Sequence, residues 1–350
     1  MTYRAETLTA FGQRALAAVG VPSGEALTIA ETMVEADSRG IHSHGLMRLP
    51  IYVRRLQRDL IRRVARIEVR EGGGDAAVAV IDGHGSAGQL VATRAMALAI
   101  ELAERHGIGA VLATRSNHFG IAGRYAQMAA QRHMIGLALS NTAPLMPPVG
   151  GAEKVLGNNP LAIAAPSGGP YPLLLDMAMS GAALGKILYA EAQGQPIPEG
   201  WGADRDGRPT TDPGEVARGG FILPVGGPKG FGLALMIELL TGVLAGGQFA
   251  KRIPSMYNLE QGQEISHWML AIDAARFGDA EQFVRHAAQL AEDVKHARKA
   301  DGVLELYLPG EPEFRLAAER LAHGIPLDAQ VAAELDALAA ELGVPLLSAE

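Results

Sequence analysis

The N-terminal part of the chain has the apolar period of helices. Large apolar residues recur on one face over residues 7–19, until Gly20 and Pro22 supply the signals that end a helix. A second helix is predicted over residues 23–37 and a third over residues 46–66. The chain therefore begins with a helical region.

The third predicted helix carries a proline and a row of arginines. Pro50 indicates a kink or a restart, because proline has no N–H for the preceding turn. The basic residues recur every four positions, at Arg54, Arg58, Arg62 and Arg66. Such a row could hold an anionic ligand, but a solvated helix face paired with acidic neighbours is the favoured interpretation.

From residue 77 the apolar residues gather in short runs that are typical of strands. Strands are predicted at residues 77–82, 109–113, 135–140 and 172–176, and helices at 88–106 and 120–133 separate the first three. This order is β-α-β-α-β. Further along, the pattern predicts helices at 230–245, 279–299 and 328–342, strands at 268–272 and 303–308, and a long irregular connection over 193–220.

Composition narrows the class of protein. The 350 residues predict two structural units with a core large enough to fold unaided. The absence of cysteine excludes disulfides and thiolate chemistry, and a net charge of −7 spread along the chain argues against a nucleic-acid partner. No secretory signal pattern occurs, and the longest apolar run, residues 231–245, contains Glu238 and is too short to span a bilayer. We expect a cytoplasmic enzyme with no membrane partner.

A glycine pattern suggests a dinucleotide site. Gly83, Gly85 and Gly88 form G-x-G-x-x-G between a predicted strand and a predicted helix, which is the context of a Rossmann fingerprint. The acidic residue that should end the second strand is missing, since that strand ends at Thr114 and Arg115. Arg115 could take a 2′-phosphate, but a tight strand-to-helix turn is the favoured explanation of the glycines.

The densest group of titratable residues lies between Asp37 and Tyr52. A helix that starts near Ser43 puts His44, Arg48 and Tyr52 on one face. Imidazole moves protons at neutral pH, guanidinium grips a carboxylate through two hydrogen bonds, and phenol orients a neighbouring oxygen. The set suits a small carboxylate substrate, although for any one of these residues alone a structural polar contact is the favoured explanation.

Two further segments carry candidate ligand groups. His118 lies in the loop after the second predicted strand, and Lys229 stands among glycines at a predicted helix start, where free N–H groups favour a phosphate. Capping by the loop and a solvated lysine explain these residues equally well. The apolar stretch over residues 140–160 fits the wall of a pocket.

Other kinds of site are not supported by the sequence. His42 and His44 lack further ligands at metal-binding spacing, so no metal is predicted. Neither a nucleotide phosphate-binding loop nor a nucleophile elbow occurs.

Six motifs occur in an order and spacing that resemble one family. They are DSRGIHSHGLMRLP from Asp37, SNHFGIAG from Ser116, LGNNPLAIAAP from Leu156, LDMAMS from Leu175, GWGADRDGRPTTDP from Gly200 and GGPKGFGLALM from Gly226. Over about residues 30–310 the chain resembles the second, non-Rossmann malate/L-lactate dehydrogenase family. That family also contains ureidoglycolate dehydrogenase, sulfolactate dehydrogenase, 2,3-diketogulonate reductase and the Δ1-piperideine-2-carboxylate reductases. On this resemblance the glycine fingerprint becomes a decoy.

The resemblance implies a fold and an activity. The expected fold is α/β (α+β), with a central non-Rossmann cofactor domain and a mixed sheet over residues 76–311. A helical substrate and dimerisation domain is expected from residues 1–75 and 312–350. The implied enzyme is a homodimeric NAD- or NADP-dependent oxidoreductase of small 2-oxo or 2-hydroxy acids, with its site near the subunit interface. The alternatives are a reductase of cyclic imino acids and a catalytically silent nucleotide-binding protein.

The resemblance also implies roles for residues. His44 looks like the proton donor, with Ser43 and Asp176 as candidates to orient it, and Arg48 looks like the carboxylate clamp. His118 looks like a second substrate-facing imidazole and is the rival proton donor. The cofactor is expected along His118, Phe119, Gly120, Ile121, Ser140, Leu174, Leu175, Asp176, Lys229, Pro309, Gly310 and Glu311.

Two positions depart from the family pattern. Arg124 stands where an uncharged residue is more usual, and Pro228 replaces a residue that is often bulkier or polar. Both put the substrate and cofactor preference in doubt and leave the reaction class untouched. Asp176 has two implied roles, in the histidine relay and at the cofactor, which the sequence does not separate. The exact substrate and the choice between NAD and NADP also stay open.

Overall fold

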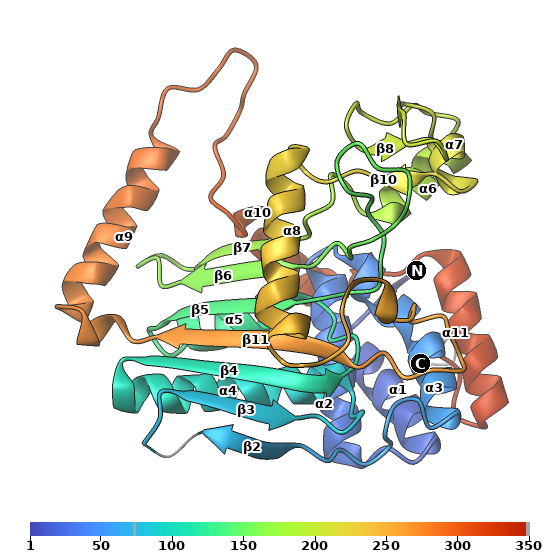
Figure 1. Cartoon of the computed structure of the whole chain (residues 1–350), viewed down its shortest axis with the longest axis horizontal. Helices are drawn as coiled ribbons and strands as arrows, with labels where there is room; N and C mark the ends of the chain where they lie inside the picture. The colour runs from blue at the N-terminus through green and yellow to red at the C-terminus, as the bar shows by residue number, and fades with distance from the viewer. Residues whose placement is uncertain (73–74, 348–350) are drawn as a thin grey trace.

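A seven-stranded mixed sheet forms the centre of the computed structural model, which describes residues 1–72 and 75–347 (Figure 1). The order across the sheet is β2 (Glu68–Gly72), β3 (Val78–Asp82), β4 (Ile108–Ser116), β11 (Ile265–Ile272), β5 (Ile135–Ser140), β6 (Leu161–Ala165) and β7 (Leu173–Met177). Helices α4 (Gly88–His106) and α5 (Ala122–Ala130) cover one face, and α8 (Pro228–Glu238) crosses the other. The predicted mixed α/β fold class is confirmed.

The alternation of side chains along the strands separates two apolar layers. On β5, Ala138 belongs to the core under α4 and α5, while its neighbour Leu139 packs on the α8 side. Glycine allows the helices to approach closely, because a Cβ at Gly109 or Gly136 would overlap a backbone carbonyl of α4 or α5. The sheet is therefore covered tightly on the face that carries α4 and α5.

Sheet topology differs from the order that the sequence predicts. β3 and β4 are parallel neighbours, as a β-α-β unit requires. β11, however, lies between β4 and β5 and is antiparallel to both. The first three predicted strands thus run in one direction, but β4 and β5 are not adjacent. β11 arrives from a distant part of the chain, so no local pattern identifies it as their neighbour.

The two ends of the chain build one helical core. It contains α1 (Ala5–Ala18), α2 (Ser23–Ser38), α3 (Leu49–Gln57) and α11 (Ala329–Leu342), with α10 (Glu311–His323) packed against α2. Phe11, Leu46 and Leu335 are fully buried in it. The short strands β1 (Thr2–Tyr3) and β12 (Ile325–Pro326) also pair here. The proposed division of the chain into two domains stays a prediction.

Two predicted elements are wrong, and two strands of the central sheet were not predicted. Residues 303–308 form no strand. The backbone hydrogen bond to β7 is made by the next residue, with Leu174 N donating to Pro309 O at 3.0 Å. The third helix ends at Gln57, and Asp59 follows with a left-handed φ of 56°. Arg62 and Arg66 therefore lie beyond the helix, and the basic row does not share one helical face. β2 and β6 have no clear signal in the sequence.

The connection predicted as irregular contains a small sheet of its own. Within it lie β8 (Gly202–Ala203), β9 (Pro209–Thr210) and α7 (Pro213–Ala217), completed by β10 (Phe221–Ile222) and by α6 (Leu184–Ala192), which packs on α7. This unit stands at the upper right in Figure 1, and α9 (Ala280–Lys295) projects from the opposite side of the sheet.

Candidate active site

A sharp turn precedes α3 and sets the direction of the candidate catalytic residues. His42–His44 form a 3-10 turn, and Gly45 then adopts an extended backbone against buried Asp37. A Cβ at Gly45 would overlap the Asp37 carboxylate, which accepts a hydrogen bond from Leu46 N at 2.8 Å. A helix that starts near Ser43 therefore does not form, because the chain breaks at Gly45 and α3 begins at Leu49.

Two imidazoles nevertheless come together beside α3. The rings of His44 and His118 are stacked, with centroids 5.4 Å apart and an interplanar angle of 21°. Ser43 Oγ lies 2.9 Å from His44 Nδ1, and Tyr52 Oη lies 2.6 Å from His118 Nδ1. Each ring thus has its Nδ1 bonded to a neighbouring hydroxyl. Nε2 of each ring has no hydrogen-bond partner among the described residues, so it is the atom left for a ligand.

The loop after β4 holds His118 from its backbone and from the next side chain. His118 N donates to Oε1 of buried Gln263 at 3.2 Å. Phe119 is stacked between Tyr125, at 5.0 Å, and His267, at 4.5 Å between centroids. The half-buried imidazole is therefore mounted on a rigid stack of aromatic rings.

Arg48 presents a positive charge to this pair. Its Nε donates to Ser43 O at 2.6 Å, and its Nη1 donates to the hydroxyl of Tyr257. It forms no ion pair with an acidic side chain in the described ranges, residues 1–72 and 75–347. An unpaired guanidinium next to two imidazoles fits a carboxylate ligand.

Burial and the Arg48 charge keep both imidazoles neutral. The pKa of His44 falls to about 4, with burial as the larger cause and Arg48 as the second. The pKa of His118 is lowered well below its usual value by burial, and then by His44, Arg48 and His267. Both rings are therefore neutral at pH 7, and their lowered pKa values make them weak bases until a ligand changes the charge around them. A carboxylate on Arg48 cancels part of its charge, so binding raises both pKa values.

Asp176 does not contact His44. Asp176, on β7, accepts a hydrogen bond from Gly123 N, at 2.7 Å, in the first turn of α5. Burial raises the pKa of Asp176 to about 6. No hydrogen bond joins Asp176 to His44 among the described residues, where Ser43 is the partner of His44 Nδ1, so a role of Asp176 in orienting His44 stays a prediction. A carboxylate at a helix N-terminus stabilises α5 instead.

Some of the residues expected at the cofactor lie together. Gly310 has a φ of 83°, and a Cβ there would lie 2.8 Å from Leu174 Cβ, so the turn after Pro309 packs against β7. Glu311 binds Lys295 Nζ at 2.9 Å and also pairs with Arg315. The segments of residues 174–176 and 309–311 are thus neighbours, and the two basic side chains occupy the Glu311 carboxylate.

Ser140 and Lys229 contrast with each other as ligand groups. The Ser140 hydroxyl is buried and bonded to Asn141 O and His267 Nδ1, both at 2.9 Å. Lys229 is exposed at the start of α8 and has no partner among the residues described. Before it, Gly226 and Gly227 have φ values of 59° and 61°, and a Cβ at either position would meet no atom within 4 Å. This open, positive turn fits the phosphates of a nicotinamide dinucleotide.

The glycine fingerprint is explained by packing. Gly85 has a φ of 76°, and a Cβ at Gly88 would overlap backbone carbonyls of the loop at residues 117–118. Arg115 is committed to buried Asp82, with Nε 2.9 Å from Oδ1. The tight-turn interpretation therefore holds, and Arg115 is not free to bind a 2′-phosphate.

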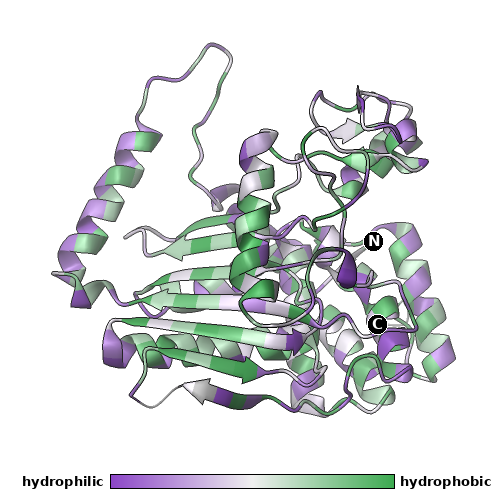
Figure 2. Cartoon of the chain, viewed as in Figure 1, coloured by the Kyte–Doolittle hydropathy of each residue, from purple (hydrophilic) through white to green (hydrophobic). Residues whose placement is uncertain are grey.

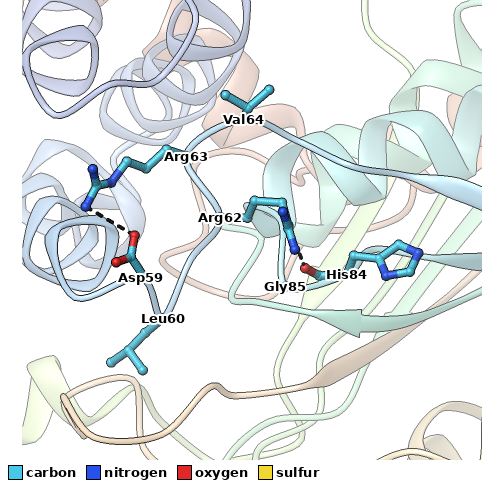
Figure 3. Close-up of a pocket in the computed structure, with 7 residues that line it drawn as sticks. All are labelled: Asp59, Leu60, Arg62, Arg63, Val64, His84 and Gly85. Atoms are coloured by element: carbon cyan, nitrogen blue, oxygen red, sulfur yellow. Dashed lines mark hydrogen bonds and ion pairs between the residues drawn. The ribbon is translucent and has the colours of Figure 1, made fainter.

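A cavity of about 400 Å³ lies beside this turn (Figure 3), and neither His44 nor His118 is among the residues that line it. Its basic side chains already have partners in the protein. Arg63 pairs with Asp59 at 3.1 Å, and Arg62 Nε donates to His84 O at 3.2 Å. None of the residues predicted for catalysis lines it.

Four residues around the imidazole pair were not predicted to act there, namely Asp37, Tyr257, Gln263 and His267. Asp37 belongs to a motif that was recognised, so its position was available from sequence. The other three come from one segment far along the chain, with no local signal. Within the described part of the chain, no group of three His, Asp or Glu side chains could hold a metal, and no helix is long and apolar enough to cross a membrane.

Comparison with known proteins gives consistent matches over nearly the whole chain. A family model described as malate/L-lactate dehydrogenase matches residues 3–336. Malate dehydrogenase of Pyrococcus horikoshii is 40% identical over 347 residues, which cover 97% of this chain and 95% of the relative. L-sulfolactate dehydrogenase of Methanocaldococcus jannaschii is 40% identical over 325 residues, 93% of this chain and 92% of the relative.

Solved structures share the fold. The sulfolactate dehydrogenase structure from Methanocaldococcus jannaschii has a TM-score of 0.93 and 38% identity, with 99% of each chain covered. A Δ1-piperideine-2-carboxylate reductase structure from Pseudomonas syringae has a TM-score of 0.86 and 28% identity, covering 97% of this chain and 99% of that one.

Proposed function

The chain belongs to the malate/L-lactate dehydrogenase family, and on that premise we propose that it moves a hydride between a nicotinamide cofactor and C2 of a small 2-hydroxy acid. It is an oxidoreductase that acts on CH–OH groups. Substrates of the malate or sulfolactate type are the best candidates. The observation that carries the proposal is the stacked imidazole pair, with Nε2 of each ring unbonded, beside the unpaired guanidinium of Arg48.

The chain's own residues supply proton transfer and orientation. A bound nicotinamide carries the hydride. Arg48 holds the carboxylate, and His44 Nε2 takes the proton of the 2-hydroxyl during oxidation and returns it to the carbonyl oxygen during reduction. Ser43 fixes the His44 ring through Nδ1, and Tyr52 fixes His118 in the same way, so that His118 directs its Nε2 to the substrate.

The proposed cofactor contacts follow the edge of the sheet. They use the loop at residues 118–121, the β7 segment at residues 174–176 and the turn at residues 309–311. Lys229 meets the phosphates at the start of α8. This arrangement does not distinguish NAD from NADP. Arg115, the candidate residue for binding the 2′-phosphate of NADP, is already paired with Asp82.

A homodimer is proposed from the exposed side of α8 and its continuation. Figure 2 shows this helix as strongly apolar, and it leaves large hydrophobic side chains exposed at Leu233, Leu235, Met236, Leu239, Leu240, Val243 and Leu244. A contiguous apolar face of this kind is typical of an interface. Since Lys229 begins the same helix, a subunit interface there lies next to the cofactor site. The expectation of a cytoplasmic location stays a prediction.

The alternative substrate is a cyclic imino acid. The same His44 would then protonate the ring nitrogen instead of a carbonyl oxygen, and Arg48 would hold the same carboxylate. The structural similarity to a piperideine-2-carboxylate reductase is the observation that favours it. A silent nucleotide-binding protein is disfavoured because His44, Arg48, His118 and Lys229 are all present.

One assay tests these functions together. Oxaloacetate, sulfopyruvate, pyruvate and Δ1-piperideine-2-carboxylate are each offered with NADH and with NADPH, and cofactor oxidation is followed by absorbance. Turnover of a 2-oxo acid supports the proposal. Turnover of the imine alone selects the alternative, and cofactor binding without turnover of any substrate contradicts both.

A further inference from the structure

Tyr257 lies over Arg48 on a segment without helix or strand. The segment runs from Ile253 to Glu264, between a short 3-10 turn and β11. Arg48 Nη1 donates to the Tyr257 hydroxyl, and the guanidinium carbon lies 5.9 Å from the ring centroid. We propose that Tyr257 is a substrate-binding residue that donates its O–H to the carboxylate on Arg48, and that Arg55 positions it. This inference rests on the proposed function.

Arg55 holds the segment on both sides of Tyr257. Its side chain, from α3, is only 1% exposed. Nη1 donates to Met256 O at 3.2 Å and to Asn258 O at 2.6 Å, and Nη2 donates to Gln261 O at 3.2 Å. The first two carbonyls belong to the residues that flank Tyr257, so this guanidinium fixes the backbone that carries the phenol.

The burial of the Arg55 guanidinium contributes little to the stability of the fold. Arg55 has no carboxylate partner among the described residues, and its Nε is buried without a hydrogen bond. A buried charge that lacks a counter-ion costs more than a well-packed apolar side chain of similar volume. What the guanidinium provides, and an apolar residue does not, is a fixed geometry for three backbone carbonyls.

A second contact joins the segment at residues 253–264 to His118. Gln263 is buried, and its Oε1 accepts the hydrogen bond from His118 N. Within the segment, Asn258 Oδ1 accepts from Glu260 N at 2.8 Å and from Gln261 N at 3.1 Å. The segment is therefore anchored at Arg55 and at His118, and Tyr257 lies between these two anchors.

The donors match the needs of a carboxylate. Arg48 uses Nε on Ser43 O and one hydrogen of Nη1 on Tyr257, which leaves the second hydrogen of Nη1 and both hydrogens of Nη2 for a ligand. The Tyr257 hydroxyl accepts from Arg48, so its own proton is free to be donated. A carboxylate oxygen that meets both groups receives two charge-assisted hydrogen bonds.

Tyr257→Phe removes the hydroxyl and keeps the ring. We expect KM for the preferred acid to rise about 10-fold, the usual effect of one hydrogen bond to a charged group, with kcat and NAD(P)H affinity close to wild type. Tyr189→Phe, an exposed tyrosine on α6, is the matched control and should change nothing. The amide analogue of the same acid should lose less efficiency with Tyr257→Phe than the acid does, because a neutral amide oxygen accepts a weaker hydrogen bond than a carboxylate. An unchanged KM for the acid overturns the proposal.

A double-mutant cycle tests whether Arg55 acts through Tyr257. Arg55→Lys keeps the charge but loses the planar set of donors, so KM should rise by a similar factor. In the Tyr257→Phe background the same change should raise KM by less than about 2-fold, because the phenol contact is already gone. Additive effects on KM would assign Arg55 a structural role only. Thermal melting and cofactor titration confirm that each variant is folded.

Failure of the proposed function is recognised separately. If wild type turns over no acid in the substrate panel, oxalate is titrated by calorimetry into wild type and Tyr257→Phe with saturating dinucleotide present. Weaker oxalate binding by the variant supports the carboxylate contact without any turnover, whereas equal binding rejects it. If wild type is active and Tyr257→Phe matches it, the function stands and this inference fails.

Discussion

The imidazole pair and the nearby His267 show what distinguishes a reactive histidine from a structural one. His267 on β11 is fully buried, with Nδ1 2.9 Å from Ser140 Oγ and Nε2 2.8 Å from Ser116 Oγ. His44 and His118 are half-buried, and each has only Nδ1 bonded to the protein. His267 therefore links three strands, while each ring of the pair keeps one nitrogen for a ligand.

Charge explains the same contrast. Burial lowers the pKa of His267 to about 3, and no cation is needed for that shift. At His44 the Arg48 charge adds to burial, so a bound carboxylate can reverse part of the shift. Proton affinity is thus adjustable by substrate at the pair and fixed at His267. The predictions below test this difference, beginning with the largest effect.

The replacement of His44 should cause the largest loss of activity. His44→Ala is expected to cut kcat by roughly 10²- to 10⁴-fold, the usual contribution of a positioned general acid or base. NAD(P)H affinity should stay near wild type, because the proposed role of His44 is toward the substrate. Steady-state kinetics and fluorescence titration measure the two quantities.

The pH profile decides between the two rings of the pair. If His44 is the acid in reduction, the limb of kcat that falls with rising pH disappears in His44→Ala and persists, at a lower rate, in His118→Ala. The opposite pattern moves the proton transfer to His118. If both variants keep the limb, neither imidazole supplies the proton.

Arg48→Lys tests the residue whose charge lets a bound carboxylate change the proton affinity of His44 and His118. A point ammonium does not reproduce the planar, bidentate grip of guanidinium on a carboxylate. We expect kcat/KM to fall on the order of 10- to 100-fold, mainly through KM. An equal loss on a carboxylate-free analogue would show instead that Arg48 only supports the turn at Ser43.

Lys229→Ala extends the comparison to the cofactor side. The Lys229 ammonium, like Nε2 of His44 and of His118, has no partner among the described residues. Its loss should therefore weaken the binding of a ligand and leave the stability of the fold unchanged. Cofactor Kd should rise about 10-fold, as for one charged hydrogen bond, with unchanged thermal stability. Equal cofactor affinity in fluorescence titration would reject the assignment.

His267→Gln should have the smallest effect on catalysis and a clear effect on stability. Because Gln cannot reach both serines, we expect a loss of about 1–3 kcal/mol in the free energy of unfolding, with kcat/KM within about 3-fold of wild type. A large loss of kcat with no change in stability would break the contrast between His267 and the pair.

The same variant should flatten the dependence of stability on pH. The folded pKa of His267, about 3, lies below the value near 6.5 of an unfolded histidine. The unfolded chain therefore binds the proton first, and stability falls as pH drops from about 6.5 toward 3. Urea titrations across this range should give a smaller slope for His267→Gln than for wild type. An identical slope would exclude a neutral, buried His267.

The sequence alone determined most of the longer helices, five of the seven strands of the central sheet and the chemistry available. Apolar periods located α1, α2, α4 and α11 within a few residues, because each of these helices buries a stripe of its own side chains. Motif composition singled out His44, Arg48 and His118 as reactive side chains. The start of the third helix near Ser43, which the sequence allowed, does not occur, because the close contact of Gly45 with Asp37 depends on packing and is absent from any local pattern.

Tertiary structure alone decided which groups meet. The position of β11 between β4 and β5, the bond of Asp176 to α5 instead of to His44, and the stack of His118 on His44 all join distant segments. So does the anchoring of Tyr257 by Arg55. A local sequence pattern shows which face of a helix or strand is buried. It does not show which other helix or strand packs on that face. That choice depends on how the helices and strands bury their surfaces together, and this burial determines which histidine keeps an open nitrogen.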